Sequence, residues 1–139
     1  MRRRAFLAGL AALGFASSAR AQTDATRAQI DLALAFASLA ALHARYGDAH
    51  PEVVSARARV ASLSTSLDDA RARHDTIDVA TVTSALDAEI ADVRARIAER
   101  STRCGAGHPE MQTAAARQVA LEDALAHVTS DGYFVPTAP

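Results

Sequence analysis

The stretch Tyr46-Gly-Asp-Ala-His-Pro-Glu-Val-Val-Ser-Ala-Arg-Ala-Arg59 recurs 58 positions later as Cys104-Gly-Ala-Gly-His-Pro-Glu-Met-Gln-Thr-Ala-Ala-Ala-Arg117. Identical pairs at this offset include Arg45/Arg103, Gly47/Gly105, His50/His108, Pro51/Pro109, Glu52/Glu110, Ala56/Ala114, Ala58/Ala116, Arg59/Arg117, Leu63/Leu121 and Leu67/Leu125. So dense a match indicates a duplicated unit, with copies at about 24–73 and 79–129. Both copies are therefore expected to have the same structure.

Each unit has the turn signals of a helical hairpin. Gly47 and Gly105 are predicted to be the left-handed residues that close a first helix, and Pro51 and Pro109 the first residues of a second helix. The turn between them is short, so the two helices must run antiparallel. These signals predict helices over 24–46, 51–73, 79–103 and 109–129.

The second helix of each unit carries an apolar stripe with a seven-residue period. In the first unit the stripe is Val53, Val60, Leu67 and Ala56, Leu63, Ala70, and in the second it is Met111, Gln118, Leu125 and Ala114, Leu121, Val128. Such stripes are packing surfaces between helices. They predict an all-α fold in which two duplicated αα-hairpins form an antiparallel up-down-up-down four-helix bundle. Extended hairpins that assemble as a coiled-coil dimer are the alternative.

Composition restricts the chemistry. The 139 residues suffice for one domain and include no lysine, which excludes Schiff-base catalysis and the lysine-containing phosphate loop. The sequence shows no clustering of a nucleophile with a base and no paired carboxylates in an apolar setting, so we predict no catalytic residues, no cofactor and no enzymatic activity.

Residues 1–21 have the form of a cleaved export signal. Three arginines precede an apolar segment, and Ala19-Arg20-Ala21 forms a cleavage site after Ala21. Arg3, Arg4, Phe6 and Leu7 resemble the twin-arginine motif, which implies export of a folded chain to the bacterial periplasm or beyond. An ordinary secretory signal is the alternative.

The mature chain that this cleavage leaves is acidic. It keeps 11 arginines against 16 acidic residues, so nucleic acid is not an expected partner. The longest apolar stretch, Ile30 to Leu42, is shorter than the ~20 residues that a membrane helix needs, and we predict no transmembrane segment. The tail 130–139 contains Tyr133-Phe134-Val135, which is expected either to dock on the bundle or to add to a partner as an extended segment.

The histidines that precede Pro51 and Pro109 have two interpretations. His50 and His108 could cap their helices through a ring nitrogen. Alternatively, since both turns lie at one end of such a bundle, they could meet at a metal site to which Cys104 and His43 would be further ligands. Four ligands would have to converge from separate segments, so we predict the capping role and no metal.

The stretch Leu42 to Leu63, with its Arg45-Tyr46 pair and its His50-Pro51 turn, is similar to the periplasmic helical region of polysaccharide co-polymerases, the chain-length-determinant proteins. The second unit matches through Gly105, His108, Pro109 and Glu110 but has Cys104 in place of tyrosine. The resemblance implies periplasmic coiled-coil assembly. Those proteins have membrane helices at both ends, which this chain is not expected to have.

Two functions follow as expectations. The first is an exported, periplasmic, non-enzymatic helical protein that acts through helix-helix contacts with a protein partner or with itself, as an accessory to a cell-envelope or polysaccharide-export complex. The second is a small metal- or ligand-binding four-helix bundle that uses the His-Pro turns. Direct carbohydrate binding is not expected, because aromatic residues make up only 4% of the chain.

Overall fold

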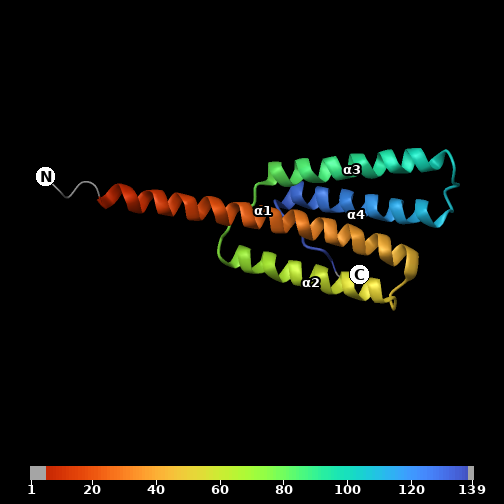
Figure 1. The fold of residues 1–139 in the computed structure, drawn as a ribbon, viewed down its shortest axis with the longest axis horizontal. Helices are drawn as coiled ribbons and strands as arrows, with labels where there is room; N and C mark the ends of the chain where they lie inside the picture. Colours follow the sequence, from red (N-terminus) through yellow and green to blue (C-terminus); the bar gives the residue numbers. More distant parts are fainter. Residues whose placement is uncertain (1–5, 138–139) are drawn as a thin grey trace.

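The computed structural model describes the backbone of residues 6–137 and the side chains of residues 23–137. This part of the chain contains four helices and no strand: α1 (Phe6–Tyr46), α2 (Pro51–Ala72), α3 (Val79–Ser101) and α4 (Pro109–Asp131). They run alternately up and down, and both hairpin turns lie at one end of the molecule (Figure 1). The predicted all-α, four-helix bundle is confirmed.

Helix α1 is the central element of the bundle. It packs against all three other helices, and α3 and α4 also pack against each other. In contrast, α2 approaches only α1 among the described helices, so a square bundle with two equivalent hairpins does not form. Figure 1 shows α2 on one side of α1 and the α3–α4 hairpin on the other.

The core is built from large side chains of α2, α3 and α4 that pack on alanines of α1. Ala33 and Ala37 are fully buried between Leu32 and Leu39, and small side chains at these positions let neighbouring helices approach closely. The large buried side chains from the other helices include Val53, Val60, Leu67, Val82, Leu86, Ile90, Val93, Leu121 and Val128.

The packing of α4 differs from that of α2 at two positions where the duplicated units carry different residues. Ala120 and Ala124 of α4 are buried, whereas the residues 58 positions earlier, Ser62 and Ser66 of α2, are exposed. The Ser66 hydroxyl donates to the carbonyl of Ser62 in its own helix. Alanine buries no polar group, so α4 packs with a broad apolar face, whereas the corresponding face of α2 is polar.

This difference rotates the buried face of α4 away from the predicted stripe. Leu121 and Val128 are buried as expected, but Gln118 and Leu125 lie at the edge of the interface. The Gln118 side chain donates to Glu122 at 2.8 Å. The predicted equivalence of the two stripes is therefore wrong, because α4 contacts α1 as well as α3.

On one side of α4, an arginine joins three helices. Arg117 Nη2 donates to Glu89 of α3 at 2.7 Å, and its Nη1 donates to the Ser38 hydroxyl of α1 at 3.0 Å. These bonds place α3 over this side of α1 and α4. The opposite side of the two helices is not covered by α3.

The first hairpin turn follows the prediction and the second departs from it. Gly47 has the left-handed φ of 76° and its N–H donates to the carbonyl of His43 at 3.0 Å. Gly105 does not adopt a left-handed φ, so the prediction for this residue is wrong. Helix α3 ends at Ser101, two residues before the predicted end, and the N–H groups of Arg103 and Cys104 bond to the carbonyl of Arg100.

The C-terminal segment 132–137 docks on the bundle. Gly132 ends α4 with a φ of 79°, and Phe134 is buried against the ring of Phe36, with 5.3 Å between ring centroids. The fully buried Gln29 holds the backbone of Phe134 from both sides: its Oε1 accepts from the N–H at 3.1 Å and its Nε2 donates to the carbonyl at 3.2 Å. The guanidinium of Arg71 lies 3.9 Å from the Tyr133 ring centre.

The export-signal residues fall largely outside the described part of the chain. Arg3 and Arg4 lie outside it, as do the side chains of Phe6, Leu7 and Ala21. The α1 backbone is continuous across Ala21 and runs on past the other three helices (Figure 1). The section Thr23–Tyr46 is long and apolar enough to cross a membrane by length and composition, and half of the 18-residue stretch that meets this criterion is buried inside the bundle.

Candidate functional site

The two predicted histidines lie at the helix starts. His50 is the N-cap residue of α2, and its Nδ1 accepts from the N–H of Glu52 at 3.3 Å. His108 caps α4 in the same way, through Glu110 and at the same distance. Each ring thus satisfies one of the free N–H groups of the first helical turn.

The four metal-ligand candidates do not converge. His50 and His108 begin helices that do not approach each other, although both turns lie at the same end of the molecule. Cys104 is free and half-buried. Among the described residues, no group of three or more His, Cys, Asp and Glu side chains could hold a metal ion.

A charged cluster at the first turn involves the remaining candidate, His43. Asp48 Oδ1 lies 2.6 Å from Arg57 Nη2 and 3.1 Å from His43 Nε2. The hydrogen bond from Arg57, together with the nearby His43, lowers the pKa of the Asp48 carboxyl. The cluster joins the end of α1, the turn and the start of α2.

This cluster belongs to the first unit alone. The residues 58 positions after His43, Asp48 and Arg57 are Ser101, Ala106 and Ala115, none of which is charged. The first turn also differs in its aromatic pair: the rings of Tyr46 and His50 stack with centroids 4.2 Å apart. These groups are therefore not required by the hairpin structure that both units share.

The cluster adjoins two shallow hollows on the face of α1, α2 and α4 over which residues 133–137 lie, here called the tail face. One hollow, of about 540 Å³, lies between α1 and α2 and has Phe36, Leu39 and Val60 among its lining residues and Arg57 at its border. Pro136 and Thr137 of the tail also line it.

The second hollow, of about 590 Å³, lies between α1 and α4 and shares Phe36 with the first. It is almost entirely apolar: alanines from both helices line it together with Val119, and His43 and Asp123 are its ionisable residues. The two hollows are here called the α2 hollow and the α4 hollow. Along the tail face, the two hollows continue from the tail towards the hairpin turns.

Two of the exposed large apolar side chains, Val119 and Val135, lie on the tail face. The four such residues in the described chain are Val119 (65% exposed), Val54 (53%), Tyr46 (40%) and Val135 (39%). Val119 borders the α4 hollow and Val135 lies in the tail. Val54 is three positions before Arg57, and Tyr46 is three after His43, so each shares a helix face with a hollow-lining residue. Clustered exposed apolar side chains mark interaction surfaces.

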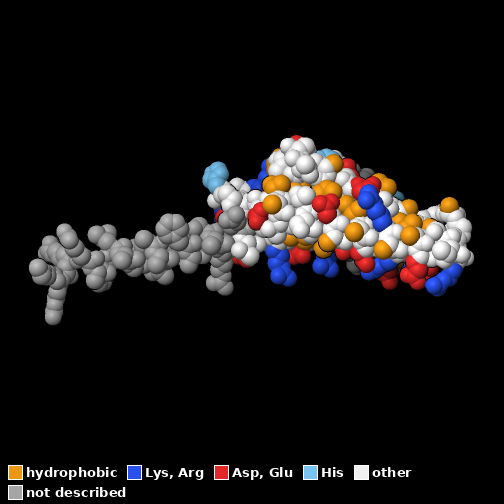
Figure 2. Space-filling view, turned by 90° about the horizontal axis from the view of Figure 1, so that it is seen from above, with side chains coloured by type: hydrophobic (Ala, Val, Ile, Leu, Met, Phe, Trp, Pro, Cys, Tyr) orange, Lys and Arg blue, Asp and Glu red, His pale blue; other side chains and the backbone are white. Residues whose placement is uncertain are grey.

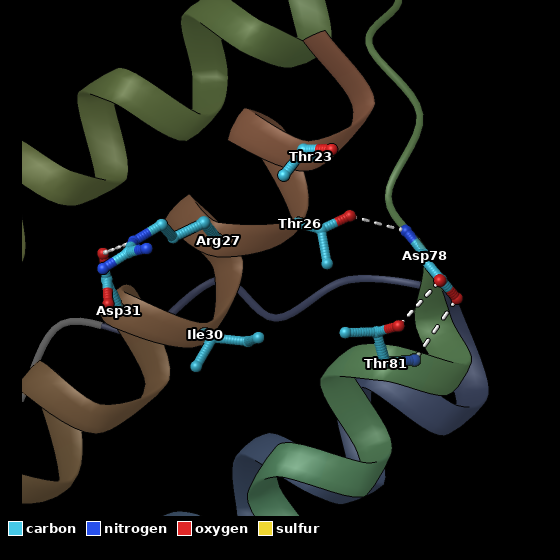
Figure 3. A pocket seen from close by; sticks show the side chains of 7 residues that line it. All are labelled: Thr23, Thr26, Arg27, Ile30, Asp31, Asp78 and Thr81. Carbon is cyan, nitrogen blue, oxygen red and sulfur yellow. Dashed lines mark hydrogen bonds and ion pairs between the residues drawn. The ribbon is translucent and has the colours of Figure 1, made fainter. Parts of the chain in front are cut away.

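A third hollow, of about 620 Å³, lies where α1 enters the bundle (Figure 3). Its polar groups are engaged with one another. Thr26 Oγ1 accepts from the N–H of Asp78 at 2.9 Å, and the Asp78 carboxylate accepts from the N–H and the hydroxyl of Thr81. The hydroxyl of Thr81 is the main cause of the lowered pKa of Asp78. These bonds cap α3 and fix its start on α1, which is a structural role.

Charged side chains of both signs also occur away from the tail face. Figure 2 shows acidic and basic side chains interspersed along the face that it presents. Glu122 of α4, for example, pairs with Arg94 of α3 at 2.7 Å, and hydrogen bonds from Gln118 and Arg94 lower the pKa of Glu122. Such pairs connect neighbouring helices at the surface. The tail face, with its two hollows, is the best candidate for a functional site, and its chemistry suits binding.

Compared with models of protein families, with curated proteins and with solved structures, the chain gives no match. The case for a function therefore rests on the site itself.

Most residues of the tail face could not be identified from the sequence. Residues that recur in both units point to the His-Pro turns instead. Phe36, Asp48, Arg57 and Val119 were not selected, although the first three belong to the unit whose turn is charged. The useful signal is the set of positions at which the two units differ.

Proposed function

We propose that this chain is an exported, non-enzymatic helical protein that acts in the bacterial periplasm by docking a protein chain on its tail face. One observation carries the proposal: the exposed Val119 lines an almost entirely apolar hollow that adjoins a second hollow, next to a charged cluster that the second unit lacks. A binding function explains these features, which the hairpin structure does not need.

The start of the mature chain supports the export step. Thr23 and Asp24 follow the predicted cleavage site, and threonine at an N-cap with aspartate in the first turn is a typical helix start. Cleavage after Ala21 would leave α1 with these residues at its new end. It would also retain every residue of the described core, which begins at Ala25.

The export route gives a direct prediction. Replacing Arg3 and Arg4 together by lysine is expected to leave the chain unprocessed in the cytoplasm, because the twin-arginine route needs the arginine pair. The measurement is the ratio of precursor to mature protein in fractionated cells. Arg2→Lys, which keeps the pair, is the matched control and should be processed normally. Equal processing of the double variant would assign the leader to the general secretory route.

The docking surface gives a second prediction. A photo-crosslinking amino acid placed at Val119 is expected to give a covalent adduct with another chain in the periplasm, because this side chain is exposed beside the α4 hollow. The same amino acid at the exposed Ala91 of α3 is the control and should give none. Adducts from both positions, or from neither, would contradict a docking role for the tail face.

The resemblance of the His-Pro turns to polysaccharide co-polymerases suggests the cellular setting. We propose that the docked chain belongs to a cell-envelope or polysaccharide-export complex. Contact between polypeptide chains supports this role without direct binding of sugar. Loss of surface polysaccharide on deletion of the gene, restored by the natural chain and not by a Val119→Arg chain, is the expected result.

A further inference from the structure

A hollow of about 230 Å³ between α1, α3 and α4 gathers arginines from three helices. It is lined by Arg45 of α1, Arg96 and Arg100 of α3 and Arg117 of α4, together with one carboxylate, Glu110. The acidic mature chain keeps only 11 arginines, so this hollow, here called the arginine hollow, holds a large share of its positive charge. It shares no lining residue with the two hollows of the tail face, so a ligand bound in it would leave the docking surface free.

The first unit has a counterpart of this hollow without the additional arginines. The counterpart, of about 380 Å³, lies between α1 and α2 and is here called the first-unit hollow. Among the described residues that line it, Asp31 and Arg59 are the charged ones. The hairpin structure alone therefore does not account for Arg96 and Arg100, whose places are taken here by a serine and a leucine. The matching pairs of lining residues, 58 positions apart, are Ala35/Val93, Ser38/Arg96, Leu42/Arg100, Ser55/Thr113, Ala56/Ala114 and Arg59/Arg117.

Three arginines of the arginine hollow each hold one carboxylate and keep donors for a further acceptor. A guanidinium has five N–H donors, and one ion pair does not use them all. Because these pairs are partly exposed to solvent, they contribute little to stability, and an incoming anion can share or replace the carboxylate. The pairs are Arg96–Asp92 at 2.7 Å, Arg100–Glu110 at 3.0 Å and Arg117–Glu89 at 2.7 Å.

Arg45 brings a charge that no described carboxylate offsets. Its guanidinium lies 5.1 Å from the centre of the Tyr46 ring, and among the described residues it forms no ion pair. Together with the three paired arginines, it leaves four guanidinium groups against three carboxylates around the hollow. An anion is the ligand that would balance this excess of positive charge.

The arrangement of donors suits an anion with several charged oxygens. A planar guanidinium binds phosphate and carboxylate groups through paired N–H donors, and donors from three helices can reach more oxygens than the two of a carboxylate. The volume is several times the ~30 Å³ that one water molecule occupies, so a phosphate group fits with part of its hydration water. We propose that the arginine hollow binds a phosphate group, either of a soluble phosphate or of the headgroup of an anionic phospholipid.

The first test is calorimetric titration of the mature chain with inorganic phosphate and with pyrophosphate at physiological ionic strength. We expect saturable binding of one anion per chain. Replacing Arg96 and Arg100 together by glutamine should weaken this binding by about tenfold or more, because it removes two charged donors from the hollow.

Replacing Arg27 and Arg59 together by glutamine is the matched control. It removes the same charge from exposed positions outside the arginine hollow, and Arg59 is the first-unit counterpart of Arg117. This variant should bind phosphate as the natural chain does. Equal helical content and melting by circular dichroism check that both variants are folded. Equal weakening in the two variants would overturn the proposal, since it would reflect only a general attraction of anions to surface charge.

Vesicles distinguish the two sources of the phosphate group. The natural chain is sedimented with vesicles of phosphatidylglycerol, and vesicles of phosphatidylcholine are the control. Binding to the phosphatidylglycerol vesicles alone, lost in the Arg96 and Arg100 variant, assigns the hollow to a lipid headgroup. Binding of phosphate or pyrophosphate without binding to vesicles assigns it to a soluble phosphate. A chain that binds none of these probes would refute the proposed site.

Discussion

Replacing Phe134 by alanine is expected to lower the free energy of unfolding of the mature chain by about 3–5 kcal/mol. The ring is 1% exposed and contacts Phe36 of α1 and His127 of α4, so its removal leaves a cavity between the tail and two helices. The measurement is urea unfolding followed by circular dichroism. Such a loss would show that the short tail contributes as much to stability as a core residue of a helix.

Two variants in the same region control this result. Val135→Ala changes the next residue, which is 39% exposed, and should alter stability by only about 0.5 kcal/mol. Gln29→Met keeps the volume of the buried side chain but leaves the backbone N–H and carbonyl of Phe134 unpaired, which should cost about 1–3 kcal/mol. If Phe134→Ala were no more harmful than Val135→Ala, the tail would not be docked in solution.

Leu121→Ala is expected to cost about 2–5 kcal/mol, and Leu63→Ala about 1–2 kcal/mol, although the two leucines are equivalent positions of the repeat. Leu121 is fully buried in α4, whereas Leu63 is only partly buried, because among the described helices α2 packs on α1 alone. Both values come from the same unfolding measurement.

In the next pair of repeated leucines, the substitution in α2 should cost more stability than the one in α4. Leu67 of α2 is buried and its equivalent Leu125 of α4 is only partly buried, so Leu67→Ala should be the more harmful substitution. This reversal excludes a general weakness of the first unit as the explanation. Equal losses within both pairs would indicate a symmetric bundle with two equivalent hairpins.

The fold class and the starts of α2, α3 and α4 could be predicted because local signals determine them. The His-Pro turns define where α2 and α4 begin, whatever surrounds them. Which of α2 and α4 packs with the broader apolar face could not be predicted, since identical leucines occur in both. It depends on small differences such as Ser62 against Ala120, whose effect appears only when two helices approach each other.

The candidate site was harder to predict for a related reason. Repetition draws attention to residues that stabilise both hairpins, and His50 and His108 have this role. The tail face combines α1 and α2 with α4 and the tail, and no local pattern reveals that segments so distant in sequence share one surface. Only the unmatched charges at His43, Asp48 and Arg57 could have indicated it.

The one-sided attachment of α2 has a consequence for local unfolding. Since α1 and the tail are the only described segments that α2 contacts, it can detach while α1, α3 and α4 stay packed as a three-helix unit. Its amide hydrogens should therefore exchange with solvent through partial opening, whereas those of α1 should need global unfolding. Detachment would also dismantle the α2 hollow, so a partner bound there would hold α2 in place.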